Sequence, residues 1–441
     1  MKSFLRRLGR ILPWLQTGWS ILGVTLVMVV LLELGLRGIF LLKDRWKPQI
    51  PLDPRVVSED RDGGAWLPLH YRELEALSDR WQPYVYFRQR PFPGQTVTVL
   101  ADGLRATWLP PPWQGDGERA RPLKILMLGG SSLWGFGARD DQTIPSLIAR
   151  GLHERGVRAE VRNLAEIGYV STQEVIALFR ELQQGYRPDL VLFYDGVNDS
   201  TSALLEGQPT VTTNEVNRVR EFNILQSPAR LASALAGNLI QNSALFRFAG
   251  SVSRRSGVGR VKEPKALSES ELIGLAMGVV RGYVANVELV EALGKAYGFR
   301  PVLVWQPDIF LKPKLVPFEA EEKAKFGLAS SLFTEVHRQL ERADALVSNP
   351  VFLNLSGIFL EDESLQFLDF CHTTEEANAR IAGVLVSKLL ERFHGKNGTG
   401  RQSRTGDLWS QKTGRSRDPC RNQLLQDQLF TATGRACGRK K

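Results

Sequence analysis

From residue 123 onward, short apolar runs alternate with segments of helical periodicity, and this alternation limits the possible folds more than any other feature. The apolar runs predict five strands: "LKILML" (123–128), "AEVRNLA" (159–165), "PDLVLFY" (188–194), "RPVLVWQP" (300–307) and "VFLNLS" (351–356). Helical periodicity covers the segments between and after them: 143–155, 172–184, about 225–298, 329–342 and 374–393. Strands that alternate with helices predict an α/β fold with a parallel sheet and helices on both faces.

A second constraint lies near the N-terminus, where the 22 residues from Ile11 to Leu32 contain no charged side chain. About 20 apolar residues are enough to span a bilayer as a helix. A buried core helix and a cleaved signal peptide are the alternatives. However, the stretch is long for a signal peptide, and no Ala-x-Ala-like cleavage site follows it. We therefore expect residues 11–36 to anchor the chain in a membrane. The four basic residues within 1–10 favour a cytoplasmic N-terminus.

Changes in composition divide the chain into four parts. Residues 1–43 are the basic segment and the anchor, and 44–122 are a linker and a small β extension. Residues 123–395 form the main domain, in which 200–298 is a mostly helical insertion, and 396–441 are a basic tail of disordered type. The linker proper is the Pro- and charge-rich stretch 44–66. Within the extension, alternation over 84–108 and the pair Asp102-Gly103 predict a hairpin.

The net charge of +10 is concentrated at the two ends of the chain. Residues 396–441 contain 11 Lys/Arg and 3 Asp/Glu, and the first ten residues add four basic ones. Residues 11–395 are left with 42 basic and 44 acidic side chains, so we expect no nucleic-acid binding by the folded part. The three cysteines, Cys371, Cys420 and Cys437, have no metal-ligand or disulfide pattern, and we expect neither a metal nor a cofactor.

Chemically informative residues follow the ends of the predicted strands. In an open parallel sheet, ligands bind beyond the carboxyl ends of the strands. The residues at these positions are Gly129-Gly130-Ser131-Ser132, Gly168, Gly196-Val197-Asn198-Asp199 and Gln306, with Asp369 and His372 just before the last helix. They are therefore predicted to meet at one edge of the sheet.

This set contains the parts needed for acyl transfer. Ser131 is the candidate nucleophile, His372 the base that takes its proton, and Asp369 the carboxylate that orients His372. Ser132 is the rival nucleophile, whereas Cys371 is interpreted as a packing residue. The alternatives with a purely structural role are that Ser131 is a turn serine and that His372 caps a helix. The remaining histidines lie in helical or terminal contexts and do not follow the end of a predicted strand.

An acyl-transfer site also needs donors for the oxyanion. We assign these to the backbone N–H groups of Ser131 and Gly168 and to the side chain of Asn198. Gly130, Asp199 and Gln306 are candidate substrate-binding residues, although Asn198 and Gly168 could also be ordinary turn residues.

Taken in order, these blocks resemble those of the SGNH (GDSL-type) hydrolase superfamily. That family has a Gly-Asp-Ser block, a lone Gly, a Gly-x-Asn-Asp block and Asp-x-x-His near the C-terminus. Here the blocks are Gly129–Ser131, Gly168, Gly196–Asp199 and Asp369–His372, and the likeness covers about 123–395. It implies a three-layer α/β/α, flavodoxin-like fold and ester chemistry. The departure is Gly130, which stands where the family usually has Asp.

The leading expectation is a serine esterase or deacetylase that acts through an acyl-serine on an O-acyl ester, with acetyl as the expected acyl group. The anchor, the "DGLRAT" segment and the "GGSS" block also resemble membrane-attached members associated with bacterial surface polysaccharides. We therefore expect a single-pass protein of the bacterial inner membrane, with the main domain outside the cytoplasm and a surface or exported glycan as substrate. The alternatives are an O-acyltransferase with the same triad and a non-catalytic glycan-binding or assembly protein.

Overall fold

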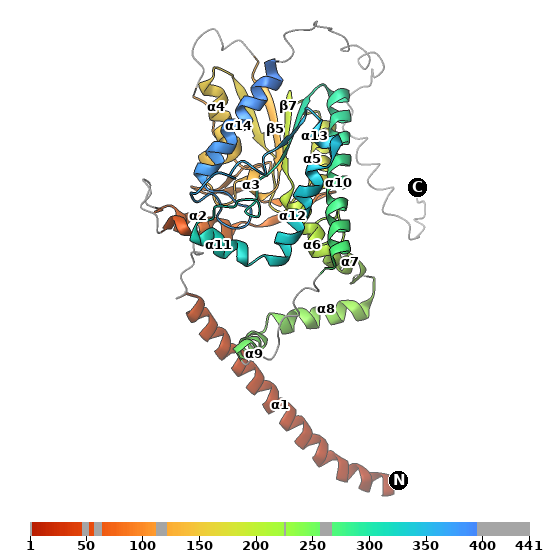
Figure 1. The fold of residues 1–441 in the computed structure, drawn as a ribbon. Helices are drawn as coiled ribbons and strands as arrows, with labels where there is room; N and C mark the ends of the chain where they lie inside the picture. The colour runs from red at the N-terminus through yellow and green to blue at the C-terminus, as the bar shows by residue number, and fades with distance from the viewer. Residues whose placement is uncertain are drawn as a thin grey trace, which may run out of the picture. The chain divides into compact units, whose positions relative to one another are not determined.

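Five parallel strands form the central sheet of the computed structural model (Figure 1), which describes residues 2–45, 53–56, 64–111, 121–224, 226–255 and 267–394. Across the sheet the order is β6 (Ala159–Asn163), β5 (Leu123–Gly129), β7 (Leu190–Asp195), β8 (Arg300–Trp305) and β9 (Phe352–Asn354). Numbered along the chain, this is the order 2-1-3-4-5 of flavodoxin-like folds. Each predicted strand is present.

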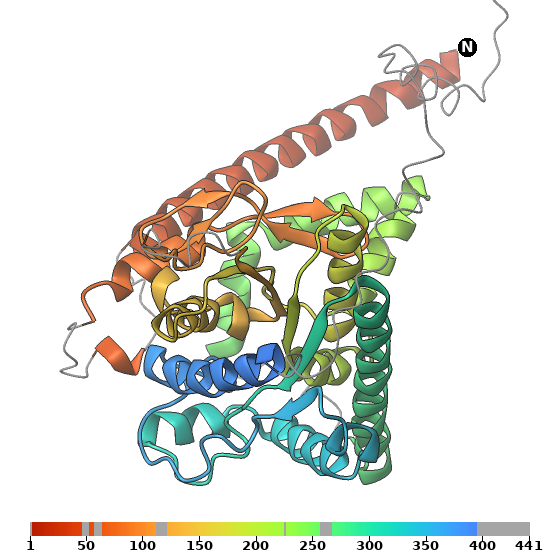
Figure 2. The same ribbon diagram turned by 90° about the horizontal axis from the view of Figure 1, so that it is seen from above.

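Helices cover both faces of this sheet, as Figures 1 and 2 show. One face carries α4 (Ile144–Glu154) and α14 (Glu375–His394). The other carries α5 (Ser171–Gln183), α10 (Glu269–Tyr297) and α12 (Gly327–Glu341). Successive side chains of a strand point to opposite faces, so Ile125 and Met127 enter the first layer and Leu126 and Leu128 the second. The predicted three-layer α/β/α architecture is confirmed.

The starts of two helices follow directly from local sequence. The Thr143 hydroxyl accepts a hydrogen bond from the Ser146 N–H and thereby caps the N-terminus of α4. Ser268 and Glu271 form a capping box at the start of α10. Although α10 ends the predicted insertion 200–298, it buries Val279, Tyr283 and other residues in the core and therefore belongs to an outer layer of the sandwich.

The first two strands of the β extension, β1 (Asp79–Gln82) and β2 (Tyr86–Gln89), form a hairpin. After α2 (Leu67–Ala76) and this hairpin, β3 (Phe92–Pro93) pairs with β4 (Thr98–Val99), and the chain reverses at Asp102-Gly103 as predicted. Gly103 has a φ of +89°, a conformation that glycine adopts without strain. The buried Arg105 then forms an antiparallel bridge with Asn163 of β6, so the extension is attached to the main sheet.

Part of the predicted linker contacts the main domain. Asp53 is buried and pairs with Arg55, and the Arg55 guanidinium donates to the Gly137 carbonyl at 2.8 Å. Residues 46–52 and 57–63 of the linker lie outside the described residues. So do 112–120 and the tail 395–441, which contains Cys420 and Cys437.

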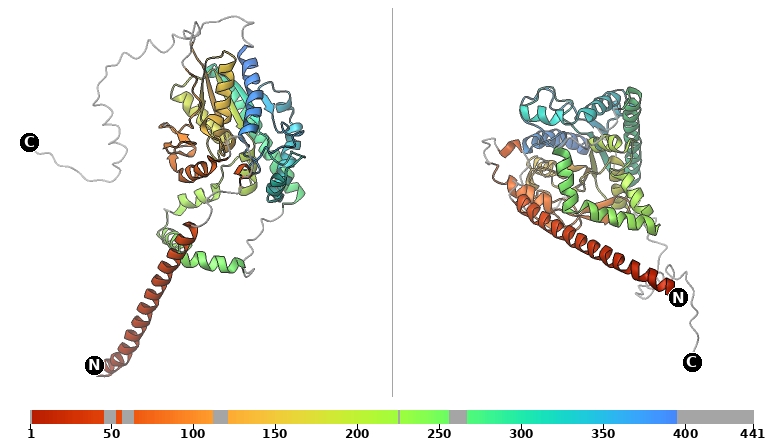
Figure 3. Two further views of the ribbon diagram at one scale, coloured as in Figure 1. Left: turned by 90° about the vertical axis from the view of Figure 1, so that its left-hand side faces the viewer. Right: turned by 90° about the horizontal axis from the view of Figure 1, so that it is seen from below.

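The remaining described helices include α1 (Lys2–Arg45), one continuous helix in Figure 3. The others are α3 (Ser131–Trp134), α6 (Val197–Glu206), α7 (Glu215–Ile224), α8 (Pro228–Gln241), α9 (Ala244–Arg255), α11 (Pro317–Ala324) and α13 (Asp344–Val347). Two described helices, α1 and α10, are long and apolar enough to cross a membrane. Almost half of the apolar stretch of α10 is buried in the protein, whereas that of α1 has no buried residue.

Candidate active site

The sharp turn at the end of β5 presents Ser131. The strand ends at Gly129, and the short helix α3 begins at Ser131. Ser131 thus lies beyond the carboxyl end of its strand, where ligands bind in open parallel sheets. The Ser131 hydroxyl lies 2.7 Å from Nε2 of His372, which comes from the loop before α14. Residues 241 positions apart are thus brought into hydrogen-bond contact by the sheet topology.

The other ring nitrogen of His372 is bound to Asp369. Nδ1 lies 2.5 Å from Asp369 Oδ2, and Asp369 Oδ1 accepts the backbone N–H groups of Cys371 and His372, each at 2.8 Å. The carboxylate is therefore fixed by its own loop as well as by the imidazole. The three predicted triad residues form one continuous chain of contacts, from carboxylate to imidazole to hydroxyl.

The charge of Asp369 follows from these contacts. Burial raises the pKa of the Asp369 carboxyl, but the adjacent His372 and the hydrogen bonds from His372 and Cys371 outweigh burial and lower the pKa to about 2. The group is therefore ionised at neutral pH. An ionised partner holds His372 in the tautomer that carries a proton on Nδ1 and leaves Nε2 free to accept the serine proton.

The predicted oxyanion donors are the backbone N–H groups of Ser131 and Gly168 and the side chain of Asn198, whose Nδ2 lies against Gly130, next to Ser131. The Asn198 side chain comes from the first turn of α6, and its Nδ2 donates to the Tyr169 carbonyl at 2.7 Å, which leaves the second amide hydrogen available. Gly168 precedes Tyr169 and has a φ of +79°. Within the part of the chain that the structure describes, neither the Ser131 nor the Gly168 backbone N–H binds an acceptor.

Close packing against Asn198 explains the glycine at position 130. A Cβ atom added to Gly130 would lie 2.2 Å from Asn198 Nδ2, much closer than any real contact. Gly130 itself has extended backbone angles, so space rather than conformation requires glycine. At position 130 the SGNH hydrolases usually have Asp. In this chain, the side chain of an Asp at that position would displace the Asn198 amide. Gly130 therefore positions Asn198 and offers no side chain to a ligand.

Ser132 and Gln306 form a support behind the nucleophile. The Ser132 hydroxyl donates to the Cys371 carbonyl at 3.3 Å and accepts from Gln306 Nε2 at 3.2 Å. Ser132, the rival nucleophile, thus binds the backbone beside His372, while the ring nitrogen contacts Ser131. Gln306, expected as a pocket residue, is only 3% exposed and connects β8 to the serine turn.

Asp199, a candidate substrate-binding residue, lies in a buried acidic cluster. Its carboxylate accepts a hydrogen bond from the Ser171 hydroxyl at 2.6 Å. Glu174 and Asp195 are also buried, and burial raises the pKa of Asp195 to about 8 and that of Glu174 well above its usual value. Burial therefore favours the protonated forms of these groups, and Asp199 is held beside them by Ser171.

Several side chains around the site were not identified from the sequence. The Phe136 ring lies 4.5 Å from the His372 ring and covers the imidazole. Phe87 of the β extension and Thr213 of the loop before α7 reach within about 4 Å of where a side chain on Gly168 would begin. No motif marks these residues, because their positions depend on how the extension and the insertion fold onto the sheet.

Three residues of the site also form a possible set of metal ligands. Among the described residues, Asp369, Cys371 and His372 are the group of three possible ligands whose atoms lie within 4.8 Å of one another. Two of them already bind each other, and burial raises the pKa of the Cys371 thiol well above its usual value. A protonated thiol is a poor metal ligand, so this set is better suited to proton transfer than to holding an ion.

No family model and no curated protein matches the chain. Among solved structures, the acetyl xylan esterase AlAXEase is 13% identical, with a TM-score of 0.33 and coverage of 60% of this chain and 98% of that one. A lipolytic protein of the G-D-S-L family from Veillonella parvula DSM 2008 is also 13% identical, with a TM-score of 0.32 and coverage of 61% and 97%.

A third similar structure is the lipase Lip_vut3 from a goat rumen metagenome, which is 12% identical. Its TM-score is 0.35, with coverage of 60% of this chain and 97% of that one. At such identities and TM-scores, the chemistry of this chain has to be inferred from its own site.

Proposed function

We propose that this chain is a serine esterase of the SGNH (GDSL) type, which cleaves an O-acyl ester through an acyl-serine intermediate. The observation that supports this proposal is the chain of contacts from Asp369 through His372 to Ser131, at 2.5 and 2.7 Å. A serine hydroxyl is a weak nucleophile unless an adjacent base takes its proton. The chain supplies such a base at the carboxyl edge of its sheet.

In the first half of the reaction, Ser131 Oγ attacks the ester carbonyl carbon while its proton passes to His372 Nε2. The carbonyl oxygen becomes negatively charged, and the N–H groups of Ser131 and Gly168 and the Asn198 amide stabilise it. The carbon–oxygen bond to the alcohol then breaks. His372 returns its proton to the departing alcohol, and the acyl group remains on Ser131.

In the second half, water replaces the alcohol. His372 takes a proton from the water as its oxygen attacks the acyl-serine, and the same donors stabilise the second oxyanion. Collapse releases the carboxylic acid and returns the proton to Ser131 Oγ. Asp369 stays ionised throughout and stabilises the imidazolium in both halves.

A short acyl group suits the surroundings of the oxyanion donors. Phe87 and Thr213 approach the Gly168 side of the site, and Phe136 covers His372. We therefore place an O-acetyl ester first among the substrates, carried by a surface or exported glycan. The apolar exposed α1 would hold the protein in the bacterial inner membrane, with the basic residues 1–10 in the cytoplasm and the site outside.

The full chain and its Ser131→Ala variant, purified in detergent, test this function with p-nitrophenyl acetate. We expect Ser131→Ala to lower kcat by roughly 10⁵-fold. A fluorophosphonate should label Ser131 in the wild type, and this labelling should be absent in Ser131→Ala. Ser132→Ala is the matched control and should keep kcat within about tenfold, because it loses only the two hydrogen bonds to Cys371 and Gln306. Equal rates for the wild type and Ser131→Ala would refute the proposal.

A further inference from the structure

The segment around α8 and α9 has almost no buried side chains. Helix α8 has no buried residue, although isolated helices of its length are marginal in water. On one stripe of α8, Leu231, Leu235 and Leu239 are 40%, 57% and 76% exposed, and Phe246 of α9 is 53% exposed. An exposed apolar stripe on a helix with few contacts to the rest of the protein indicates a surface that binds another protein or a membrane.

The charge of the same segment is one-sided. Residues 222–262 contain no Asp or Glu and six Lys or Arg. Among them, Arg230 lies one position before the leucine stripe begins. Helices that combine an apolar face with basic residues and lack acidic ones are typical of those that lie on membrane surfaces. Anionic headgroups would complement this charge.

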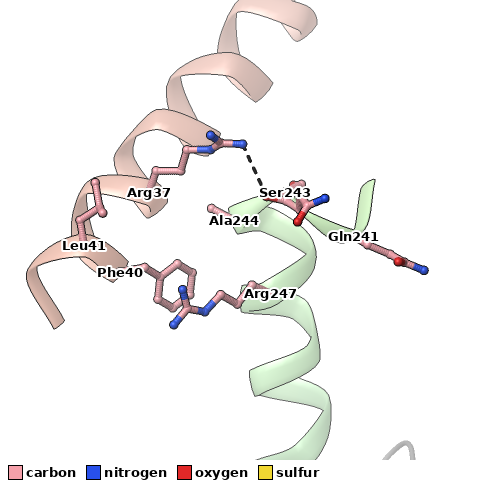
Figure 4. Close-up of a pocket in the computed structure, with 8 residues that line it drawn as sticks. Arg37, Phe40, Leu41, Gln241, Ser243, Ala244 and Arg247 are labelled. Atoms are coloured by element: carbon pink, nitrogen blue, oxygen red, sulfur yellow. Dashed lines mark hydrogen bonds between the residues drawn. The ribbon is translucent and has the colours of Figure 1, made fainter. Parts of the chain in front are cut away.

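The N-terminus of α9 is bound directly to α1, the helix with the properties of a membrane span. The Glu33 carboxylate accepts hydrogen bonds from the Ser243 hydroxyl and the Ala244 N–H, both at 2.8 Å, and from the Leu245 N–H at 3.0 Å. It thereby caps α9, as acidic groups do at helix N-termini. Figure 4 shows the adjoining contacts, in which the Arg247 guanidinium lies 4.3 Å from the Phe40 ring.

The position of Glu33 along α1 sets the depth of this contact. From Ile11 to Glu33 an α-helix rises roughly 33 Å, close to the thickness of about 30 Å of a bilayer's hydrocarbon core. If Ile11 lies at one boundary of that core, Glu33 lies at the other. Helix α9, whose N-terminus is bound to Glu33, then starts at headgroup level. The exposed apolar residues of α8 and α9 continue the lipid-facing surface of α1.

We propose that the α8–α9 segment (residues 228–255) is a second membrane-binding element that lies on the anionic lipid surface crossed by α1. This inference rests on the proposed anchor and not on the esterase chemistry. Lipid is favoured as the occupant because the exposed apolar surface adjoins that of α1 and because the segment is exclusively basic. A second copy of the chain would have to cover the same face with an equally basic segment.

Reporter cysteines in the full chain test the proposal, in a background carrying Cys420→Ser and Cys437→Ser with the buried Cys371 retained. Bimane is attached at Leu239→Cys on α8, at Val24→Cys on α1, or at Val347→Cys on α13, which are 76%, 65% and 63% exposed in the native chain. The protein is reconstituted in vesicles of phosphatidylcholine and phosphatidylglycerol that contain a lipid with a nitroxide high on its acyl chain. Circular dichroism verifies that each variant is folded.

We expect the nitroxide to quench the Leu239 reporter severalfold more than the Val347 reporter, and phosphatidylcholine alone to weaken quenching at Leu239 but not at Val24. Quenching at Leu239 no stronger than at Val347, with Val24 still quenched, would overturn this inference and leave the anchor intact. Loss of quenching at Val24 would overturn the anchor itself. A Leu239 reporter that is quenched only at one chain per vesicle, and is shielded from the nitroxide when several chains share a vesicle, would identify a second copy as the occupant of this face and overturn the proposal.

Discussion

The protein contains two closely similar His–Asp pairs in very different surroundings. In one, His372 Nδ1 lies 2.5 Å from Asp369, and in the other, His337 Nε2 lies 2.6 Å from Asp308. The first pair is partly open, with side chains 13% and 30% exposed, and its free nitrogen meets Ser131. The second is sealed, with side chains 5% and 1% exposed, and within the described chain His337 Nδ1 has no partner.

The difference teaches that the pair alone does not make a site. Both imidazoles are oriented by a carboxylate, but only His372 has a hydroxyl to deprotonate and solvent within reach. The sealed pair instead fixes the loop after β8, since Asp308 Oδ1 also accepts the Phe310 N–H at 2.9 Å. Substitutions that remove each pair in turn should therefore affect different quantities.

The largest expected effect is that of Asp369→Asn on catalysis. The amide cannot stabilise the imidazolium and can hold His372 in the wrong tautomer, so we expect kcat for p-nitrophenyl acetate to fall by roughly 10⁴-fold. Steady-state kinetics on the folded variant measure this change. A kcat within tenfold of the wild type would show that the open pair works no differently from the sealed one.

The matched change in the sealed pair, Asp308→Asn, should act on stability instead. It breaks a buried pair and leaves His337 without its carboxylate, which costs about 3 kcal/mol in the free energy of unfolding. Denaturant unfolding measures this loss, while kcat per folded molecule should stay within tenfold. A large loss of kcat without loss of stability would place Asp308 in the catalytic machinery.

The smallest expected effect is a pH dependence that belongs to the open pair. The pKa of Asp369 in the folded chain is about 2, below its ordinary value of 3.8. On acidification the unfolded chain binds this proton first, so the stability that Asp369 contributes is present above about pH 4 and is lost as the pH falls toward 2, by about 2 kcal/mol in total.

Unfolding of the wild type and of Asp369→Asn at both ends of this pH range measures that contribution. The difference in their free energies of unfolding should shrink on acidification. A difference that does not change with pH would mean that the Asp369 carboxylate is not stabilised by His372.

Comparing the two pairs also shows what could be predicted from the sequence. Asp369 and His372 are three positions apart, so their partnership was predicted from local spacing. Asp308 and His337 are 29 positions apart on a loop and on α12, and no local pattern connects them. The same holds for Phe136 above His372 and for Phe87 and Thr213 near Gly168, which meet the site only because distant segments fold over it.

The helices and strands, and the edge of the sheet at which the site lies, can be predicted from local sequence patterns. Apolar periodicity is a local property, and parallel strands must place their carboxyl ends together, so Ser131, Asn198 and His372 could be assigned to one edge. Only the tertiary structure decided which serine meets the imidazole, why Gly130 must be glycine, that Gln306 and Asp199 are buried, and that Glu33 caps α9. These depend on packing within a few ångströms between residues far apart in the chain, which periodicity and spacing do not encode.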